Sequence, residues 1–184
     1  MKTIFTPHAG EFLVGERIER MRGLNLWIPS KDDGVDLLVT DEANQRSCSL
    51  QVKFSRDYSD THDMPDLGND HVVCSGFFKL NHQKIKTSVA DYWILIICGA
   101  KQPNKKLKVE HVIIKPKKLL AKLENTHGNL NDFKLYIAVT KERTVLDWRG
   151  LKSKAPLPSE VFRKDSSRNY TEHLEDWNCL ERLQ

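Results

Sequence analysis

Two apolar segments joined by a short polar link constrain the fold of this chain more than any other feature. They lie in GVDLLVTDEANQRSCSLQVKFSR, which runs from Gly34 to Arg56. Val35 to Thr40 and Ser49 to Ser55 have the length and the composition of β-strands, and the link DEANQRS between them is polar. The segment therefore predicts a β-hairpin.

Both predicted strands carry polar residues that a buried strand normally excludes. Because side chains alternate along a strand, Gln51 and Lys53 share one face of the second strand. Asp36 lies in the first strand, and the hairpin would bring it close to that pair. We therefore expect a carboxylate, an amide and an ammonium group to converge.

A helix is predicted from about Pro7 to Arg22, because Thr6-Pro7 is a helix-start signal and Gly23 ends helices readily. Four of its residues follow the three- to four-residue spacing of a stripe that packs on a sheet: Glu11, Val14, Ile18 and Met21. Glu11 thus joins an otherwise apolar face. A carboxylate directed at a core needs a partner.

These polar side chains together suggest phosphodiester hydrolysis. A divalent cation between Glu11 and Asp36, with Gln51 as a neutral oxygen ligand, would satisfy the buried charge. Mg²⁺ suits such a site because it prefers oxygen ligands and retains several waters. Lys53 would orient or deprotonate the attacking water and stabilise charge on the phosphoryl oxygens. Taken singly, each residue also has a structural explanation, such as an acid at a helix N-terminus or a charge on an edge strand.

The rest of the chain alternates between strands and helices. Strands are predicted at residues 71–80, 92–98, 109–115 and 133–140, and helices at 81–89, 116–124 and near 170–183. This order predicts an α/β fold with a central mixed β-sheet flanked by helices. Residues 1–150 would form this domain, and residues 151–184 a C-terminal extension packed on it.

Charge is unevenly distributed along the chain, although the net charge is only +4. Five aspartates lie between Arg56 and His71, whereas Lys101 to Lys122 contains eight lysines and the single acid Glu110. The lysine run is weak support for contact with phosphates, since a solvated surface is the commoner explanation. The four cysteines form no CxxC pair, and no signal peptide or membrane span is evident, which indicates a reduced cytoplasmic protein without a membrane partner.

Three segments, AGEFLVGERIERMRG, DDGVDLLVTD and SLQVKFSR, in this order and spacing, resemble the restriction-endonuclease-like nuclease superfamily, whose signature is PD-(D/E)-x-K. The resemblance covers about the first sixty residues. It implies that Asp36 is the metal-binding acid, Gln51 occupies the second acidic position, Lys53 is the catalytic lysine and Glu11 is the helix-borne acid. It further implies a restriction-endonuclease-like core, an endonuclease dependent on Mg²⁺ or Mn²⁺, DNA as the partner, and a homodimer that cuts both strands.

Two positions depart from the family pattern. Val35 replaces the proline of the signature, and Gln51 replaces a carboxylate, which leaves the site one negative charge short. Weaker metal binding, a preference for Mn²⁺ or loss of activity would follow. Glu16 is a rival for Glu11 because it too follows a glycine, and Asp57 would be able to reach the site from beyond the strand end. The alternative function is a non-catalytic nucleic-acid-binding or accessory protein that retains the nuclease fold.

Overall fold

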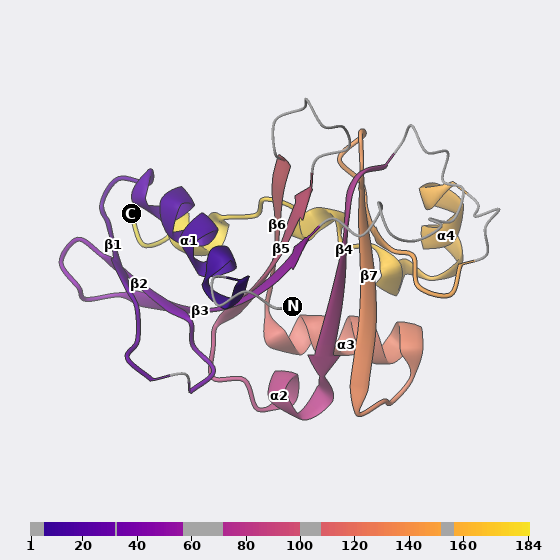
Figure 1. The fold of residues 1–184 in the computed structure, drawn as a ribbon, viewed down its shortest axis with the longest axis horizontal. Helices are drawn as coiled ribbons and strands as arrows, with labels where there is room; N and C mark the ends of the chain where they lie inside the picture. Colours follow the sequence, from indigo (N-terminus) through magenta and orange to yellow (C-terminus); the bar gives the residue numbers. More distant parts are fainter. Residues whose placement is uncertain (1–5, 32, 57–71, 100–107, 152–156) are drawn as a thin grey trace.

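A computed structural model describes residues 6–31, 33–56, 72–99, 108–151 and 157–184. The chain has a mixed α/β fold in which two β-sheets pack against each other and helices lie against both (Figure 1). None of the helices in these described ranges has the length and apolar character needed to span a membrane.

The larger sheet is mixed, as the sequence predicts. Its five strands follow the order β1 (Leu24–Trp27), β2 (Leu37–Asp41), β3 (Ser47–Arg56), β5 (Tyr92–Gly99) and β6 (Lys108–Ile114). β3 and β5 are parallel, and all other neighbours are antiparallel. The predicted hairpin corresponds to β2 and β3, in which Leu37 pairs with Leu50 and Thr40 with Ser47.

A second, antiparallel sheet contains β4 (Val72–Asn81), β7 (Asp132–Thr140) and β8 (Val145–Asp147). The strands predicted at 71–80 and 133–140 are therefore present, but they do not join the mixed sheet. Gly76 of β4 lets the two sheets approach, since a Cβ there would lie 3.0 Å from Cγ1 of Ile97. The backbone amide of Phe77 also donates to the Ser55 hydroxyl on β3, at 2.9 Å.

The predicted helices are present but differ in length, and the helix Pro158–Lys164 was not predicted. The first three are α1 (Thr6–Glu19), α2 (His82–Lys86) and α3 (Pro116–His127), and the C-terminal part adds α4 (Pro158–Lys164) and α5 (Asn178–Glu181). Asn81 caps α2 as expected, because its side chain accepts a hydrogen bond from the Lys84 amide. α1 ends before Arg22, and α2 is shorter than the predicted helix.

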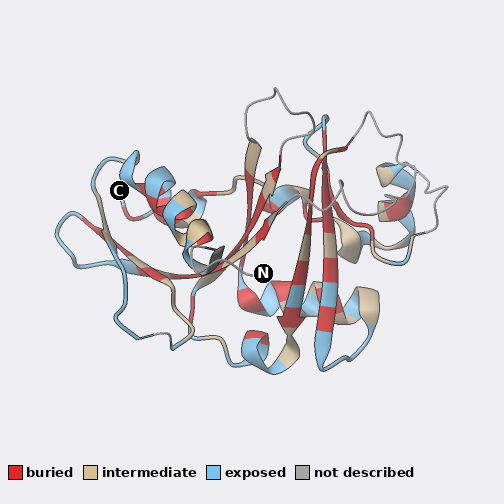
Figure 2. Cartoon of the chain, viewed as in Figure 1, coloured by how far each residue is buried: buried red, intermediate tan, exposed pale blue. Residues whose placement is uncertain are grey.

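β5 separates two hydrophobic cores, and its interior residues are buried on both faces (Figure 2). On one face, Val14 and Ile18 of α1 pack with the sheet and with Trp177 and Leu180 of the C-terminal segment. On the other face, α2, α3 and the second sheet complete a larger core. Residues far apart in the chain thus share the core beneath α1.

The C-terminal segment is also fixed by polar contacts. Arg46, in the link between β2 and β3, donates to the backbone oxygens of Arg182 at 2.7 Å and Leu183 at 2.5 Å. Gln184 donates to the backbone oxygen of Arg22 at 2.8 Å. These bonds hold the segment against the hairpin and the end of α1.

Candidate functional site

Asp36 lies where β2 begins and β3 runs beside it. Its backbone amide donates to the Leu50 oxygen at 2.8 Å, which starts the hairpin ladder. Its Oδ2 accepts hydrogen bonds from the Val52 amide, at 2.6 Å, and from the side-chain amide of Gln51. Asp36 and Gln51 are therefore in contact, and a buried backbone donor fixes the carboxylate in place.

The orientation of the Gln51 amide bears on its expected role. Gln51 is 7% exposed, and its nitrogen, not its oxygen, faces Asp36. Presenting the amide oxygen to a cation at Asp36 would require a half-turn of this amide. As it stands, Gln51 is a hydrogen-bond donor to the metal-binding acid that the resemblance implies.

Lys53 projects from the face of β3 that carries Gln51, opposite the face on which Leu50 and Val52 pack under α1. Its ammonium lies 5.5 Å from the ring centroid of Trp93 on β5. The face of an indole ring attracts a cation. This contact holds the Lys53 charge over the sheet.

Glu11 is positioned by the close packing of α1 on β3. A Cβ on Gly10 would lie 2.9 Å from the Phe54 Cβ and 3.1 Å from Cγ1 of Val52, so a larger residue would push the helix off the strand. The Glu11 side chain is 20% exposed, and its Oε2 lies 3.0 Å from Nδ1 of His8.

Glu11 and Asp36 line the same pocket, which has a volume of about 940 Å³. Its walls come from α1, from the segment between β1 and β2, and from strand residues including Phe54 and Cys98. The volume is at the upper end of the range typical of small-molecule sites. The candidate metal acids thus open onto a space large enough for a ligand.

His8 is a site residue that the sequence reasoning missed. Its pKa is raised by the hydrogen bond with Glu11, then by the charge of Glu11 and, at longer range, by that of Asp36. The charges of both candidate metal acids therefore act on His8. The i, i+3 spacing of His8 and Glu11 on a helix was the available signal.

The rival acids differ from Glu11 in their surroundings. Glu16 also lines the pocket, but its side chain is 60% exposed and forms an ion pair with Arg20 on the same helix. Asp57 lies outside the described residues. Both acids have a partner on α1, so the lower exposure of Glu11 is what favours it as the candidate helix acid.

Of the three predicted metal ligands, Glu11 and Asp36 line this pocket and Gln51 does not; Lys53 does not line it either. In the described ranges, no three or more His, Cys, Asp or Glu side chains form a group that could hold a metal ion. Mg²⁺, however, is commonly held by one or two carboxylates and several waters. Asp36 and Glu11 supply two carboxylates on one pocket.

The lysine-rich run contributes less to a phosphate-binding face than its composition suggests. Lys101, Lys105 and Lys106 lie outside the described residues, as does the acidic segment 57–70. Three of the other lysines contact groups on the same molecule: Lys108 binds Glu110 at 2.9 Å, Lys118 binds Glu172 at 3.0 Å, and Lys122 donates to the Asn169 oxygen at 2.6 Å.

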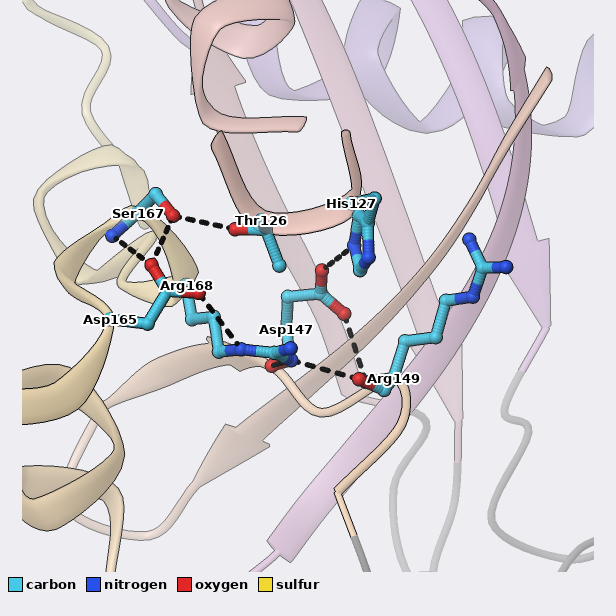
Figure 3. Close-up of polar contacts among 7 residues, drawn as sticks. All are labelled: Thr126, His127, Asp147, Arg149, Asp165, Ser167 and Arg168. Atoms are coloured by element: carbon cyan, nitrogen blue, oxygen red, sulfur yellow. Dashed lines mark hydrogen bonds and ion pairs between the residues drawn. The ribbon is translucent and has the colours of Figure 1, made fainter. Parts of the chain in front are cut away.

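A second polar cluster lies at the far end of α3, where β8 and the C-terminal segment meet (Figure 3). The ring of His127 hydrogen-bonds Asp147, and these side chains are 7% and 1% exposed. The other Asp147 oxygen accepts from the Arg149 amide at 3.0 Å. Arg168 donates to the backbone oxygens of Asp147 and Arg149 at 3.1 and 2.9 Å, and it pairs with Asp165 at 3.1 Å.

Tyr170 lies beside this cluster and is 1% exposed. Its hydroxyl has no hydrogen-bond partner among the described residues. Burial, followed by the nearby charge of Asp147, raises the pKa of Tyr170 well above its ordinary value. Sequence reasoning found none of this cluster, because its members are spread over distant elements.

Comparison of the chain with protein-family models, with curated proteins and with solved structures gives no match.

Proposed function

We propose that this protein is a metal-dependent nuclease that hydrolyses phosphodiester bonds in DNA, with a restriction-endonuclease-like core and Mg²⁺ or Mn²⁺ as its cofactor. One observation carries the proposal. Asp36, fixed at the start of the hairpin by Val52 and Gln51, lines the same pocket as Glu11. A mixed sheet with α1 packed on it agrees with the architecture that the sequence resemblance implies.

Each residue has a distinct role in this proposal. The Val52 amide and Gln51 bind Oδ2 of Asp36, and Oδ1 would bind the cation. His8 restrains the Glu11 carboxylate through its 3.0 Å contact. A bound divalent cation would supply Lewis acidity and neutralise charge on the phosphate. Lys53, attracted to the Trp93 ring, would stabilise the negative charge that develops on the phosphoryl oxygens.

Cleavage of supercoiled plasmid DNA in Mg²⁺ or Mn²⁺ tests the proposal. We expect Asp36→Ala and Lys53→Ala to lower the cleavage rate about 100-fold or more, since each removes a charge that acts on the transition state. Linear rather than nicked product would support the homodimer that the resemblance implies. Wild-type rates in both variants would overturn the assignment, because the cleavage would then not depend on this site.

Glu11→Ala and Glu16→Ala form a matched pair, since both acids are on α1 and line the pocket. We expect Glu11→Ala to lose most activity and Glu16→Ala to keep it. If Glu16→Ala lost activity and Glu11→Ala kept it, Glu16 would be the helix acid.

A non-catalytic DNA-binding protein is the second candidate, and the Gln51 amide nitrogen facing Asp36 favours it. Calorimetric titration with Mn²⁺ and fluorescence anisotropy with labelled DNA in EDTA separate the two functions. DNA binding without Mn²⁺ binding or cleavage would support this candidate. Mn²⁺ binding that Asp36→Ala removes would support the nuclease.

A further inference from the structure

We propose that Cys48 and Cys179 are an oxidation site, at which a reversible disulfide fastens α5 to β3. Cys48 lies on β3 and is 5% exposed, whereas Cys179 lies on α5 and is half-buried. Both are free cysteines that line one pocket, and each thiol affects the pKa of the other. Both residues belong to the core beneath α1. This inference is independent of the nuclease proposal.

A small oxidant can reach the pair through a separate pocket of about 580 Å³, which both cysteines line. Four basic residues share that lining: Lys86, Lys115, Lys117 and Arg182. Positive charge near a thiol stabilises its thiolate, which is the reactive form. Asp91 also lines this pocket, and the charge of Asp176 raises the pKa of Cys179, so it is the access through the pocket that distinguishes the pair from an inert core cysteine.

The two thiols have different roles. The hydrogen bond from Cys48 lowers the pKa of Cys179, although burial opposes the change. The same hydrogen bond, together with burial, raises the pKa of Cys48. Cys179 is also the more exposed of the two, so we assign it as the thiol that reacts first and Cys48 as the resolving thiol.

Hydrogen peroxide is the oxidant class that we assign to this site. The Cys179 thiolate attacks one peroxide oxygen, the O–O bond breaks, and sulfenic acid and hydroxide form. The Cys48 sulfur then attacks the Cys179 sulfur, the S–O bond breaks, and water leaves with the Cys48 proton. The two sulfurs lose two electrons in total, and the peroxide gains them.

The remaining cysteines provide a contrast within the same chain. Cys74 is fully buried on β4 in the other core, and Cys98 lies on β5 and lines the larger pocket. Neither lines the basic pocket with Cys48 and Cys179. Oxidation should thus be selective for one pair.

The test begins with reduced wild-type protein treated with hydrogen peroxide, quenched with an alkylating reagent and mapped by mass spectrometry. We expect a peptide pair linked through Cys48 and Cys179. Because the bond closes a long loop, the melting temperature should rise by about 10 °C and return to its original value with dithiothreitol. Cys98→Ala should keep the shift, and Cys179→Ser should lose it.

Two results would overturn the proposal. One is full alkylation of both thiols after peroxide treatment. The other is conversion of Cys179 to sulfinic acid without linkage to Cys48. Both are read on the wild-type protein, so the answer does not depend on whether a cysteine variant folds.

Discussion

Asp36 and Asp147 each accept one side-chain and one backbone hydrogen bond, but on one oxygen in Asp36 and on both oxygens in Asp147, and their environments differ. Asp36 accepts hydrogen bonds from the Gln51 side chain and the Val52 amide, and Asp147 accepts from the His127 ring and the Arg149 amide. Asp147 is 1% exposed, whereas Asp36 opens onto the large pocket. An enclosed carboxylate of this kind holds elements together. An open one also retains an oxygen for a ligand.

The strongest test of this comparison removes each carboxylate in turn. Asp147→Ala should lower the free energy of unfolding by about 3–5 kcal/mol, because it leaves His127 and a backbone donor buried without a partner. Asp36→Ala should cost about 1–2 kcal/mol, because water in the pocket can replace the lost acceptor. Urea unfolding measures both. If both variants lost the same free energy of unfolding, the different exposure of the two carboxylates would have no effect on stability.

Gln51→Glu tests whether the Asp36 site binds a cation, and its expected effect on stability is smaller than that of Asp147→Ala. It places a second carboxylate against Asp36, and like charges should cost about 1 kcal/mol in EDTA. Millimolar Mg²⁺ should then raise the melting temperature of the variant more than that of the wild type, because a cation binds the folded pair. Gln45→Glu, at an exposed position of the same hairpin, is the matched control. An equal response to Mg²⁺ in both variants would contradict a cation site at Asp36.

Tyr170→Phe tests the environment of the buried cluster and should change stability least of these substitutions. Its hydroxyl has no partner among the described residues, so its removal should change stability by less than about 1 kcal/mol at neutral pH. Above pH 10 the unfolded chain loses the tyrosine proton while the folded chain keeps it, and wild-type stability should fall as pH rises. The variant should lose stability less steeply in thermal unfolding from pH 9 to 11. Parallel curves would mean that Tyr170 ionises as readily in the folded protein as in the unfolded chain.

Local patterns predicted the hairpin region well. Alternation along Ser49 to Ser55 placed Gln51 and Lys53 on one face of β3, but α1 packs on the opposite face. The pocket that Glu11 shares with Asp36 is therefore not lined by Gln51 or Lys53, and the predicted convergence of all four groups is not found. The packing role of Gly10, which allows α1 to approach β3, was not predicted because it depends on tertiary structure.

Long-range pairing set the limit of the sequence reasoning. The strands at 72–81 and 132–140 were recognised, but strand periodicity does not say which strands pair, so their separate sheet was missed. β8 is three residues long, too short for a periodic signal. Because β8 was not predicted, the contact between His127 and Asp147 could not be predicted either. The roles of Glu11, Asp36, Gln51 and Lys53 in hydrolysis stay predictions.

The contacts of Arg46 with the C-terminal segment have a consequence for the timing of folding during protein synthesis. Arg46 and Arg182 are 136 positions apart, so the ribosome adds the second partner roughly ten seconds after the first. Throughout this interval α1 and the hairpin lack Trp177 and Leu180, which complete their shared core. The apolar surface of α1 and the hairpin therefore stays exposed until the C-terminal segment has been added and the shared core can close.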